Sequence, residues 1–486
     1  MSDQWTKICL TGAGSFRFSM GFLRDVIKAQ SMHPVELILH DINVPVLRDI
    51  SRTCRRWIKK NNLEGKIKVT ESINREESYE NVDYHIIVIA VGGQTSELSD
   101  IFTTLRVLHL PYNTGDTCGV PGVMRAMREI PHIVAMSKDI EKYSRCRIAL
   151  NYSNPMAFLS WASQKYAPRA NLVGICHELW GGLAALGEEF GEKYGIKNMI
   201  QAVYPETNGI QQMEKARVVV KYGGLNHFSW IYEMKIDGED VLPRIDCDAK
   251  MQKAGGDRMV NYFLLKKYGG FPVASARHNV EFMSKEDLPE YWDPLIEIAR
   301  KNPEEETFRK ACPTGPFKIM PLRNVRHMHT DHVSSIIQMR LQGLGLFPLP
   351  ELGGSGERAL AIFQNDHLNQ KYVTVGNLAN LRPDGKKIVP NLPDKTALEV
   401  DWWVDKGKVI TADWGPMPQP IADLVAKNCK NVDFVVETAL KCDRDMLVNA
   451  IQGEPSCYHL KRSEIEKCVD VLLHEQRPWL PEGWFK

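Results

Sequence analysis

The sequence predicts an α/β protein with an N-terminal doubly wound parallel sheet, followed by a second part of mixed α and β structure. Up to about residue 200, short apolar runs that end in glycine or polar turns alternate with amphipathic stretches, which is typical of strand, crossover helix and parallel strand. Beyond about residue 250, amphipathic helical patterns dominate. We therefore expect one domain over residues 1–200 and an α+β domain over residues 201–486.

A glycine turn joins the first strand to the first helix. The apolar run Lys7–Thr11 enters this turn, and an amphipathic stretch follows it. A second apolar run, Val35–His40, ends at an aspartate that can bind the ribose 2′-hydroxyl of a dinucleotide, while the helix N-terminus receives the pyrophosphate. Arg17 stands where the usual fingerprint has a third glycine, so an ordinary strand–helix connection is the alternative. The predicted NAD contacts of this Rossmann-like unit are Gly12, Gly14, Ser15, Phe16 and Asp41.

Two further buried strands should end at the same edge of the sheet. The nearly continuous apolar run Tyr84–Val91 is typical of a central parallel strand and ends at Gly92. A later run, Arg147–Tyr152, is closed by an asparagine-proline turn at Asn154, which is an ordinary turn sequence in most proteins. Because parallel strands share one carboxyl edge, we expect Gly92 and Asn151 to contact the cofactor and Asn154 to contact the substrate.

Cys176 follows the short strand Leu172–Ile175 and is the first candidate metal ligand. Cysteine and histidine both bind first-row divalent ions, and His227 follows another β-branched run downstream. A structural zinc site usually has four protein ligands with a tight local pair, which these two residues lack, so an ion shared by them would keep open positions and be catalytic. The alternative is a small buried cysteine at a strand end and a hydrogen-bonded core histidine.

The second domain begins with a β-ribbon and continues with helices. The ribbon is predicted over Ala216–Ile236, and the helical region beyond it carries the dense polar cluster Arg277–Phe282. Residues 365–418 are strand-like and rich in turns, and residues 421–475 are helical again. The segment His327–His332 could be a metal site by composition, but we favour surface or subunit hydrogen bonds for its histidines.

The bulk composition argues against several classes of partner. Lys and Arg number 61 against 60 Asp and Glu, so the net charge of +1 directs the protein toward neither nucleic acid nor an anionic membrane. The N-terminus lacks a signal-peptide pattern, and no apolar run reaches the roughly 18 residues of a membrane span. The 11 cysteines are scattered without the spacing of a disulfide scaffold. We expect a cytoplasmic protein.

Five motifs follow one another along the chain: Gly12-Ala13-Gly14-Ser15, Gly115-Asp116-Thr117, Asn151-Tyr152-Ser153-Asn154-Pro155-Met156, Cys176-His177-Glu178 and Gly224-Leu225-Asn226-His227-Phe228. In this order they resemble the signatures of glycoside hydrolase family 4, an NAD-dependent family outside two-carboxylate glycoside hydrolysis. The resemblance implies a C-terminal α+β domain of the lactate and malate dehydrogenase type, a carbohydrate substrate, and a homodimer or homotetramer.

The resemblance also implies a redox-neutral elimination. NAD takes hydride from C3 of the sugar, a base removes the C2 proton, and the glycosidic oxygen leaves. Water then adds across the double bond and NADH returns its hydride. A divalent metal, usually manganese, is bound by the residues that match Cys176 and His227, and its Lewis acidity stabilises the enolate.

In this family, the residue after the metal-binding cysteine differs between members that act on phosphorylated and on unphosphorylated sugars. Cys-His accompanies unphosphorylated sugars, so His177 is predicted to contact the substrate. The Cys-His-Glu form looks most like the α-galacturonidases, and Arg277 suits a substrate carboxylate because a guanidinium can bind it through two hydrogen bonds. Glu178 would repel a uronate if it faced C6. The first prediction is an α-galacturonidase, with α-glucosidase, α-galactosidase and α-glucuronidase as alternatives.

The proton-transfer residue differs from the pattern of this branch. Its members carry Gly-Asp where this chain has Ser275-Ala276, and that aspartate has an acid/base role in them. Imidazole and carboxylate can both be tuned toward neutral pH, so His278 and Glu281 are the candidate catalytic residues. Two other classes stay open: an NAD-dependent sugar or hydroxy-acid dehydrogenase, and a cofactor-binding protein that has lost catalysis.

Overall fold

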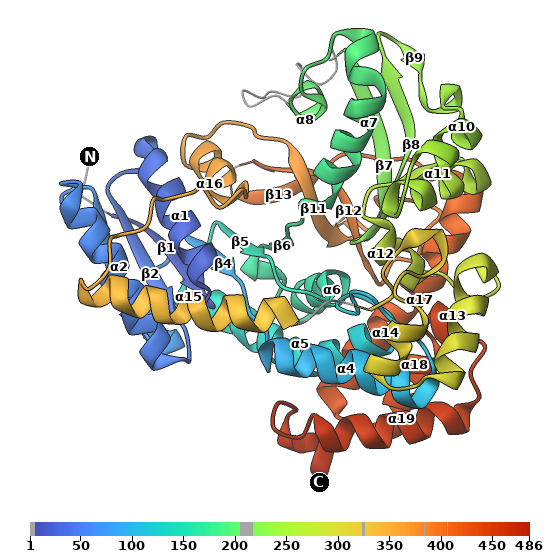
Figure 1. Ribbon diagram of the computed structural model, residues 1–486. Helices are drawn as coiled ribbons and strands as arrows, with labels where there is room; N and C mark the ends of the chain where they lie inside the picture. Colours follow the sequence, from blue (N-terminus) through green and yellow to red (C-terminus); the bar gives the residue numbers. More distant parts are fainter. Residues whose placement is uncertain (1–4, 205–216, 323–325, 383, 406) are drawn as a thin grey trace.

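A computed structural model describes residues 5–204, 217–322, 326–382, 384–405 and 407–486. A large mixed sheet and a small antiparallel sheet organise it, with helices packed around both (Figure 1). In the described ranges, no helix is long and apolar enough to cross a bilayer.

The parallel half of the large sheet has the predicted doubly wound arrangement. Its strands are β1 (Thr6–Thr11), β2 (Val35–His40), β3 (Ile67–Ser72), β4 (Tyr84–Ile87), β5 (Ile148–Asn151) and β6 (Leu172–Gly174). They lie in the order β6-β5-β4-β1-β2-β3, which is that of a Rossmann-like fold. Every residue of β4 and β5 is buried, as expected for central strands that are covered on both faces.

Helices follow each of these strands. The helix after β4 begins at the predicted glycine turn, and a second, longer helix follows it before β5. The helices of this half are α1 (Phe16–Lys28), α2 (Val44–Lys60), α3 (Arg75–Tyr79), α4 (Gly93–Leu108), α5 (Gly119–Tyr143), α6 (Met156–Tyr166), α7 (Glu178–Tyr194) and α8 (Met199–Val203).

Three antiparallel strands from the second half of the chain extend the large sheet. They are β11 (Thr374–Ala379), β12 (Ala397–Asp405) and β13 (Lys408–Thr411). Asn377 of β11 pairs with Gly174 of β6, and β12 and β13 continue outward from β11. The strand character expected for residues 365–418 is confirmed. Because the sheet crosses residue 200, the division into two domains at that residue stays a prediction.

The small sheet contains the predicted ribbon. Its strands are β7 (Val218–Leu225), β8 (Phe228–Ile236), β9 (Glu239–Asp240) and β10 (Phe271–Pro272), in the order β10-β8-β7 with β9 paired to β8. Asn226 and His227 make the turn between β7 and β8, where His227 has a φ of 64°. A Cβ on Gly224 would lie 2.4 Å from the carbonyl oxygen of Phe228, so the two strands approach too closely here for a side chain. The sequence thereby builds a tight hairpin with a histidine at its tip.

Helices form most of the remainder, as predicted. They are α10 (Cys247–Lys253), α11 (Asp257–Tyr268), α12 (Ala276–Asn279), α13 (Pro289–Lys301), α14 (Glu305–Ala311), α15 (Arg326–Leu344), α16 (Ala359–His367), α17 (Gln419–Lys441), α18 (Arg444–Gln452) and α19 (Arg462–Glu475). Helix α17 packs on α5 and α6, and α19 packs on α4. The buried Arg128 pairs with Asp100 at 2.6 Å, and Gln476 bonds to both. The C-terminal helices are therefore part of the body that carries the large sheet.

Candidate active site

The β1–α1 turn has the geometry of a nucleotide-binding loop. Gly12 has a φ of 88°, and a Cβ there would lie 1.8 Å from the carbonyl oxygen of Val88, so only glycine fits. The N–H of Gly14 donates to Asp41 Oδ2 at 2.6 Å. This bond brings the end of β2 against the start of α1, as the fingerprint predicts.

The other predicted cofactor residues lie at the same turn or at neighbouring strand ends. Ser15 is the N-cap residue of α1, and Phe16, whose side chain is outside the described part, is the first residue of the helix. Gly92 has a φ of 77° and caps α4. Asn151 ends β5, and its Nδ2 donates to the carbonyl oxygen of Ser153 at 3.0 Å. Asn151 thus shapes the loop between β5 and α6.

Cys176 and His227 come together although they are 51 residues apart. Cys176 follows β6 at the carboxyl edge of the large sheet, and His227 lies at the tip of the β7–β8 hairpin. The Sγ of Cys176 is 3.4 Å from Nε2 of His227, and both side chains are buried. Metal–sulfur and metal–nitrogen bonds of about 2.3 and 2.1 Å allow one ion to contact both atoms.

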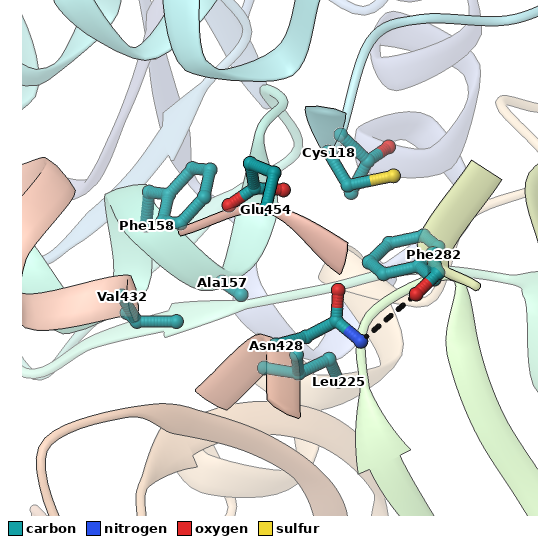
Figure 2. A pocket seen from close by; sticks show the side chains of 9 residues that line it. Cys118, Ala157, Phe158, Leu225, Phe282, Asn428, Val432 and Glu454 are labelled. Atoms are coloured by element: carbon teal, nitrogen blue, oxygen red, sulfur yellow. Dashed lines mark hydrogen bonds between the residues drawn. The ribbon is translucent and has the colours of Figure 1, made fainter. Parts of the chain in front are cut away.

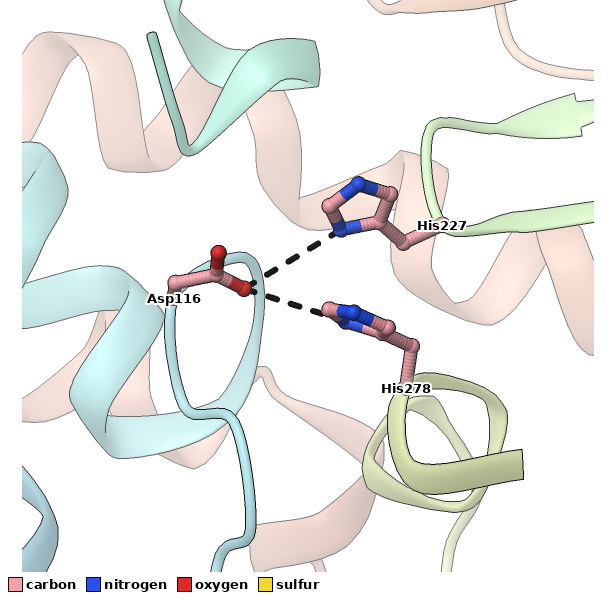
Figure 3. Close-up of side chains that lie close together, drawn as sticks. All are labelled: Asp116, His227 and His278. Atoms are coloured by element: carbon pink, nitrogen blue, oxygen red, sulfur yellow. Dashed lines mark ion pairs between the residues drawn. The ribbon is translucent and has the colours of Figure 1, made fainter. Parts of the chain in front are cut away.

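Asp116 lies beside His227 and His278 in a cluster built from three separate segments (Figure 3). Its Oδ1 is 4.0 Å from Nδ1 of His227 and 3.8 Å from Nδ1 of His278. Asn154 donates from Nδ2 to Asp116 Oδ2 at 2.9 Å. Asp116 is absent from the predicted site residues, and its place in the Gly115-Asp116-Thr117 motif is the signal that could have found it.

Burial and neighbouring charges set the protonation of this cluster. Burial, together with the nearby His278, lowers the pKa of His227 to about 3, so the His227 imidazole is neutral near pH 7. Burial raises the pKa of Asp116, but His278, His227 and Arg125 outweigh burial and lower it below the usual range. Asp116 is therefore an ionised carboxylate beside a neutral imidazole.

The surroundings of Cys176 fit a divalent metal. Burial raises the pKa of its thiol well above the usual value, and Glu399 and Glu178 raise it further, so a metal ion is needed to displace the thiol proton. Among the described residues, Asn154 Oδ1 and His278 Nδ1 are buried atoms without a hydrogen-bond partner. A thiolate and a neutral imidazole suit a first-row divalent ion with open positions, and the unpartnered Oδ1 of Asn154 can accept from a ligand.

His278 lies between two carboxylates. Its Nε2 is 4.0 Å from Glu178 Oε1, on the opposite side of the ring from Asp116. The ring centroid is 4.2 Å from that of His227, and the side chain is 13% exposed. An imidazole in this position can take a proton from a ligand, and the neighbouring carboxylates stabilise the imidazolium that forms.

Glu281 contacts a backbone loop. Its Oε1 accepts from the N–H groups of Asn113 at 2.5 Å and Thr114 at 2.8 Å, and its Oε2 accepts from Gly115 at 3.0 Å. The side chain is buried, and the next residue of the bound loop is Asp116. Its catalytic role stays a prediction, and these contacts favour an anchoring role.

His177 and Arg277 lie at more exposed positions. Nδ1 of His177 is 3.7 Å from Glu357 Oε1, and the His177 side chain is 67% exposed. Nε of Arg277 is 3.5 Å from Asp257 Oδ1, and the arginine side chain is 51% exposed. Both are at the rim of the buried cluster, and their substrate contacts stay predictions.

Two other features of the sequence lie outside this cluster. Ser275 is the N-cap residue of α12, and Ala276 is fully buried. The segment His327–His332 is helical within α15, which differs from the strand or loop expected there. The side chains of this segment are outside the described part, and so is any metal-site assignment there.

Thr117 is one of the residues that line a small cavity, which Figure 2 shows with its labelled side chains. Much of its wall is apolar and includes Phe158, Leu225 and Phe282. Glu454 also lines it, but its carboxylate already accepts from the N–H of Gly119 at 2.7 Å. The turn of the β7–β8 hairpin thus lies near a mostly apolar cavity.

The fold and the site are those of a dinucleotide-dependent enzyme with a metal centre. The sequence model of the family described as "Family 4 glycosyl hydrolase" matches residues 7–192. The model of the C-terminal domain of the same family matches residues 222–457. Together these matches cover most of the chain. The protein belongs to family 4 of the glycosyl hydrolases, as its five motifs predict.

Named relatives agree with this assignment over nearly the full chain. An α-galactosidase of Bacillus subtilis (strain 168) is 26% identical, covering 98% of this chain and 99% of its own. An α-galacturonidase of Lachnoclostridium phytofermentans is 22% identical, covering 98% of this chain and 97% of its own.

Solved structures show the same fold. A 6-phospho-α-glucosidase from gut microorganisms, in complex with NAD and Mn²⁺, has a TM-score of 0.71 at 15% identity, with 98% of this chain and 99% of that chain covered. A 6-phospho-β-glucosidase from Thermotoga maritima, with manganese and NAD⁺, has a TM-score of 0.69 at 17% identity and the same coverage. The predicted family, fold class, glycosidase activity and cofactors, NAD and a divalent metal, are confirmed.

Proposed function

We propose that this glycosidase cleaves α-glycosides of unphosphorylated sugars by the NAD- and metal-dependent elimination described above. The observation that carries the proposal is the 3.4 Å contact between Cys176 Sγ and His227 Nε2, next to the carboxylate–imidazole pair of Asp116 and His278. His177 supports the restriction to unphosphorylated sugars, because Cys-His is the form that accompanies them in the family.

Each side chain of the cluster has a distinct role in this proposal. The bound cofactors supply reversible oxidation at C3 and polarisation of the sugar hydroxyls. Cys176 and His227 hold the metal, and Asn154 orients a sugar hydroxyl through its unpartnered Oδ1. His278 removes the C2 proton, and Asp116, 3.8 Å away, stabilises the imidazolium that forms.

The charges around His278 favour a neutral sugar over a uronate. Glu178 lies 4.0 Å from His278 and would repel a substrate carboxylate, while the guanidinium of Arg277 is already paired with Asp257. An α-galactoside is therefore placed before the α-galacturonide that the motifs alone favour, in keeping with the 26% identical α-galactosidase. The α-galacturonide is the second candidate, because Arg277 is half exposed and could exchange Asp257 for a substrate carboxylate.

A panel of 4-nitrophenyl glycosides with NAD, Mn²⁺ and a thiol reductant tests the proposal. We expect cleavage of the α-galactoside, slower cleavage of the α-galacturonide and none of the 6-phosphates. Cys176→Ser should lower kcat/KM by about 100-fold or more, because a serine hydroxyl does not replace a metal-bound thiolate. Cys247→Ser in α10 is the matched control and should keep wild-type activity. Unchanged turnover in Cys176→Ser would exclude the metal assignment.

The same assay separates the glycosidase from a dehydrogenase. A glycosidase of this mechanism incorporates solvent deuterium at C2 of the released sugar without net NADH. Net accumulation of NADH from a free sugar or hydroxy acid, with every glycoside left intact, would support the dehydrogenase. Faster cleavage of the α-galacturonide than of the α-galactoside would reverse the substrate order and assign the carboxylate to Arg277.

A further inference from the structure

A chain of hydrogen bonds runs from Asp116 to the metal-binding side of His227. Thr117 Oγ1 donates to Asp116 Oδ1 at 2.7 Å, and the same oxygen lies 2.8 Å from Nδ1 of His227. On the other side of the ring, Nε2 is 3.4 Å from Cys176 Sγ. Thr117, His227 and Cys176 are all buried, so solvent does not compete for these contacts.

The chemistry of these groups fixes the direction of each bond. The Thr117 hydroxyl has one proton, and the Asp116 carboxylate only accepts, so the proton points to Asp116. The lone pairs of Thr117 Oγ1 then face His227 Nδ1, which must carry the ring proton. A neutral imidazole has one such proton, so Nε2 keeps its lone pair on the side of Cys176.

His227 could serve a metal ion on either side of its ring. Ligand atoms of Asp116, His227 and His278 lie within 4.8 Å of one another, which would suit an ion on the Nδ1 side. Such an ion needs the Nδ1 lone pair and leaves Nε2 protonated against Cys176. It would also force the Thr117 hydroxyl away from its present acceptor role. The hydrogen-bond chain therefore favours an ion on the Nε2 side.

We propose that Thr117 is a positioning residue that selects the tautomer of His227 and so directs the metal to the Cys176 side. This inference rests on the proposed function, which places the metal on Cys176 and His227. Metal-binding histidines are commonly oriented by a hydrogen bond from their second nitrogen, and losing such a partner typically weakens metal binding 10- to 100-fold. Thr117 acts through His227 and needs no contact with the sugar.

Asp116 Oδ1 is 4.0 Å from His227 Nδ1, which is too far for a hydrogen bond. The cavity that Thr117 lines has mostly apolar walls, including Phe158 and Leu225. In Thr117→Val, a methyl group takes the place of the hydroxyl at nearly the same volume. The Nδ1–H of His227 is then left without an acceptor, which favours the other tautomer, with the proton on the metal-binding side. Thr117→Ser keeps the hydroxyl and should keep the tautomer.

The test is a titration of Mn²⁺ into the full-length protein without sugar. Binding is measured by calorimetry and by the electron paramagnetic resonance signal of free Mn²⁺. We expect the Kd to rise about 10- to 100-fold in Thr117→Val and to stay within about threefold of wild type in Thr117→Ser. Thr438→Val is the matched control, because Thr438 is also buried but its hydroxyl donates to the Phe434 carbonyl in α17. It should bind Mn²⁺ like the wild type.

The outcomes separate this inference from the proposed function. If Cys176→Ser abolishes Mn²⁺ binding and Thr117→Val binds Mn²⁺ like the wild type, the positioning role is wrong while the metal site stands. If Cys176→Ser binds Mn²⁺ normally, the metal assignment in the proposed function fails, and the inference fails with it. If Thr117→Val does not fold, ¹⁵N resonances of His227 in the metal-free wild type decide: a proton on Nδ1 supports the proposal, and a proton on Nε2 overturns it.

Discussion

Glu281 holds the loop that presents Asp116 to His278. Its two carboxylate oxygens accept three backbone N–H groups, so in Glu281→Gln an amide N–H would oppose one of these donors and the loop would shift. We expect kcat/KM to fall about 10- to 100-fold, since small displacements at a reacting centre have effects of this size. The pKa values in the pH–rate profile should stay unchanged, as measured by steady-state kinetics over about pH 5–9.

Glu454→Gln is the control for this variant. Glu454 is also a buried carboxylate that accepts a backbone N–H, but its partner is Gly119 at the start of α5. The control should keep the kcat/KM of the wild type. Loss of one limb of the pH–rate profile in Glu281→Gln would contradict the anchoring role and make Glu281 the base, because burial raises its pKa to about 8.

The sequence could predict the pairing of Cys176 with His227 but not the role of Asp116. The pair can be predicted because each residue follows the end of a strand and each lies in a motif of the family. Asp116 acquires its role from side chains of the β5–α6 loop, the β7–β8 hairpin and α12, namely Asn154, His227 and His278. Distances between such separate segments are set by packing of the whole chain, which one sequence does not reveal.

Gly12 and Gly14 of the β1–α1 turn differ in the kind of atom that an added Cβ would meet. A Cβ at Gly14 would lie 2.7 Å from the Oδ2 atom of Asp41, which belongs to a side chain that can rotate away. Gly14→Ala should therefore fold normally but bind NAD about 10-fold more weakly, because Asp41 is displaced from the ribose position. Fluorescence titration with NADH and the thermal unfolding midpoint check the two parts of this prediction.

Gly12→Ala provides the contrast within the same turn. Here the added Cβ would lie 1.8 Å from the backbone oxygen of Val88, and the φ of Gly12 is 88°. Rotation of a side chain cannot relieve this strain. We expect a loss of at least about 2 kcal/mol in the free energy of unfolding. Wild-type NADH affinity in Gly14→Ala, or an unfolding midpoint as low as that of Gly12→Ala, would contradict the assignment.

The positions of the strands along the chain were more predictable than the order in which they pair in the sheet. Apolar runs and turn residues locate β1, β2 and β4 to β8, whereas β3 was not predicted, and the parallel order follows from the alternation of strands and helices. The strand-like pattern of residues 365–418 gives no sign that β11 lies beside β6, since any half-buried strand has the same pattern. The pairing depends on one register contact, Asn377 with Gly174, and on the helices packed around it.

Buried carboxylates make the stability of the whole molecule depend on pH. Burial raises the pKa of Glu454 to about 7 and that of Asp401 to about 6, from 4.5 and 3.8. A carboxyl group with a raised folded-state pKa stabilises the fold fully below its unfolded pKa and loses that contribution as the pH rises through the folded value. We expect the free energy of unfolding to fall between about pH 4 and 7, by at most about 3 kcal/mol for each group.

Thermal unfolding midpoints at about pH 5.5 and 8 measure this dependence. Glu454→Gln removes one titrating group, so its midpoint should change less with pH than that of the wild type. The variant should also be less stable at acid pH, because one amide oxygen cannot accept from both Gly119 and Asn431. An identical pH dependence in variant and wild type would show that Glu454 does not titrate in this range.

The late strand β11 has a consequence for how the chain is made. It begins 200 residues after β6 ends, since the two bounds are Gly174 and Thr374. At about 5–20 residues per second, a ribosome needs roughly 10–40 s to add that length. During this interval the nascent chain has an open β6 edge, whose unpaired backbone groups can join another chain. We therefore expect a chaperone to act on the emerging N-terminal half. Polypeptides released before β11 is made keep a sheet edge with unpaired backbone groups that can pair with another chain.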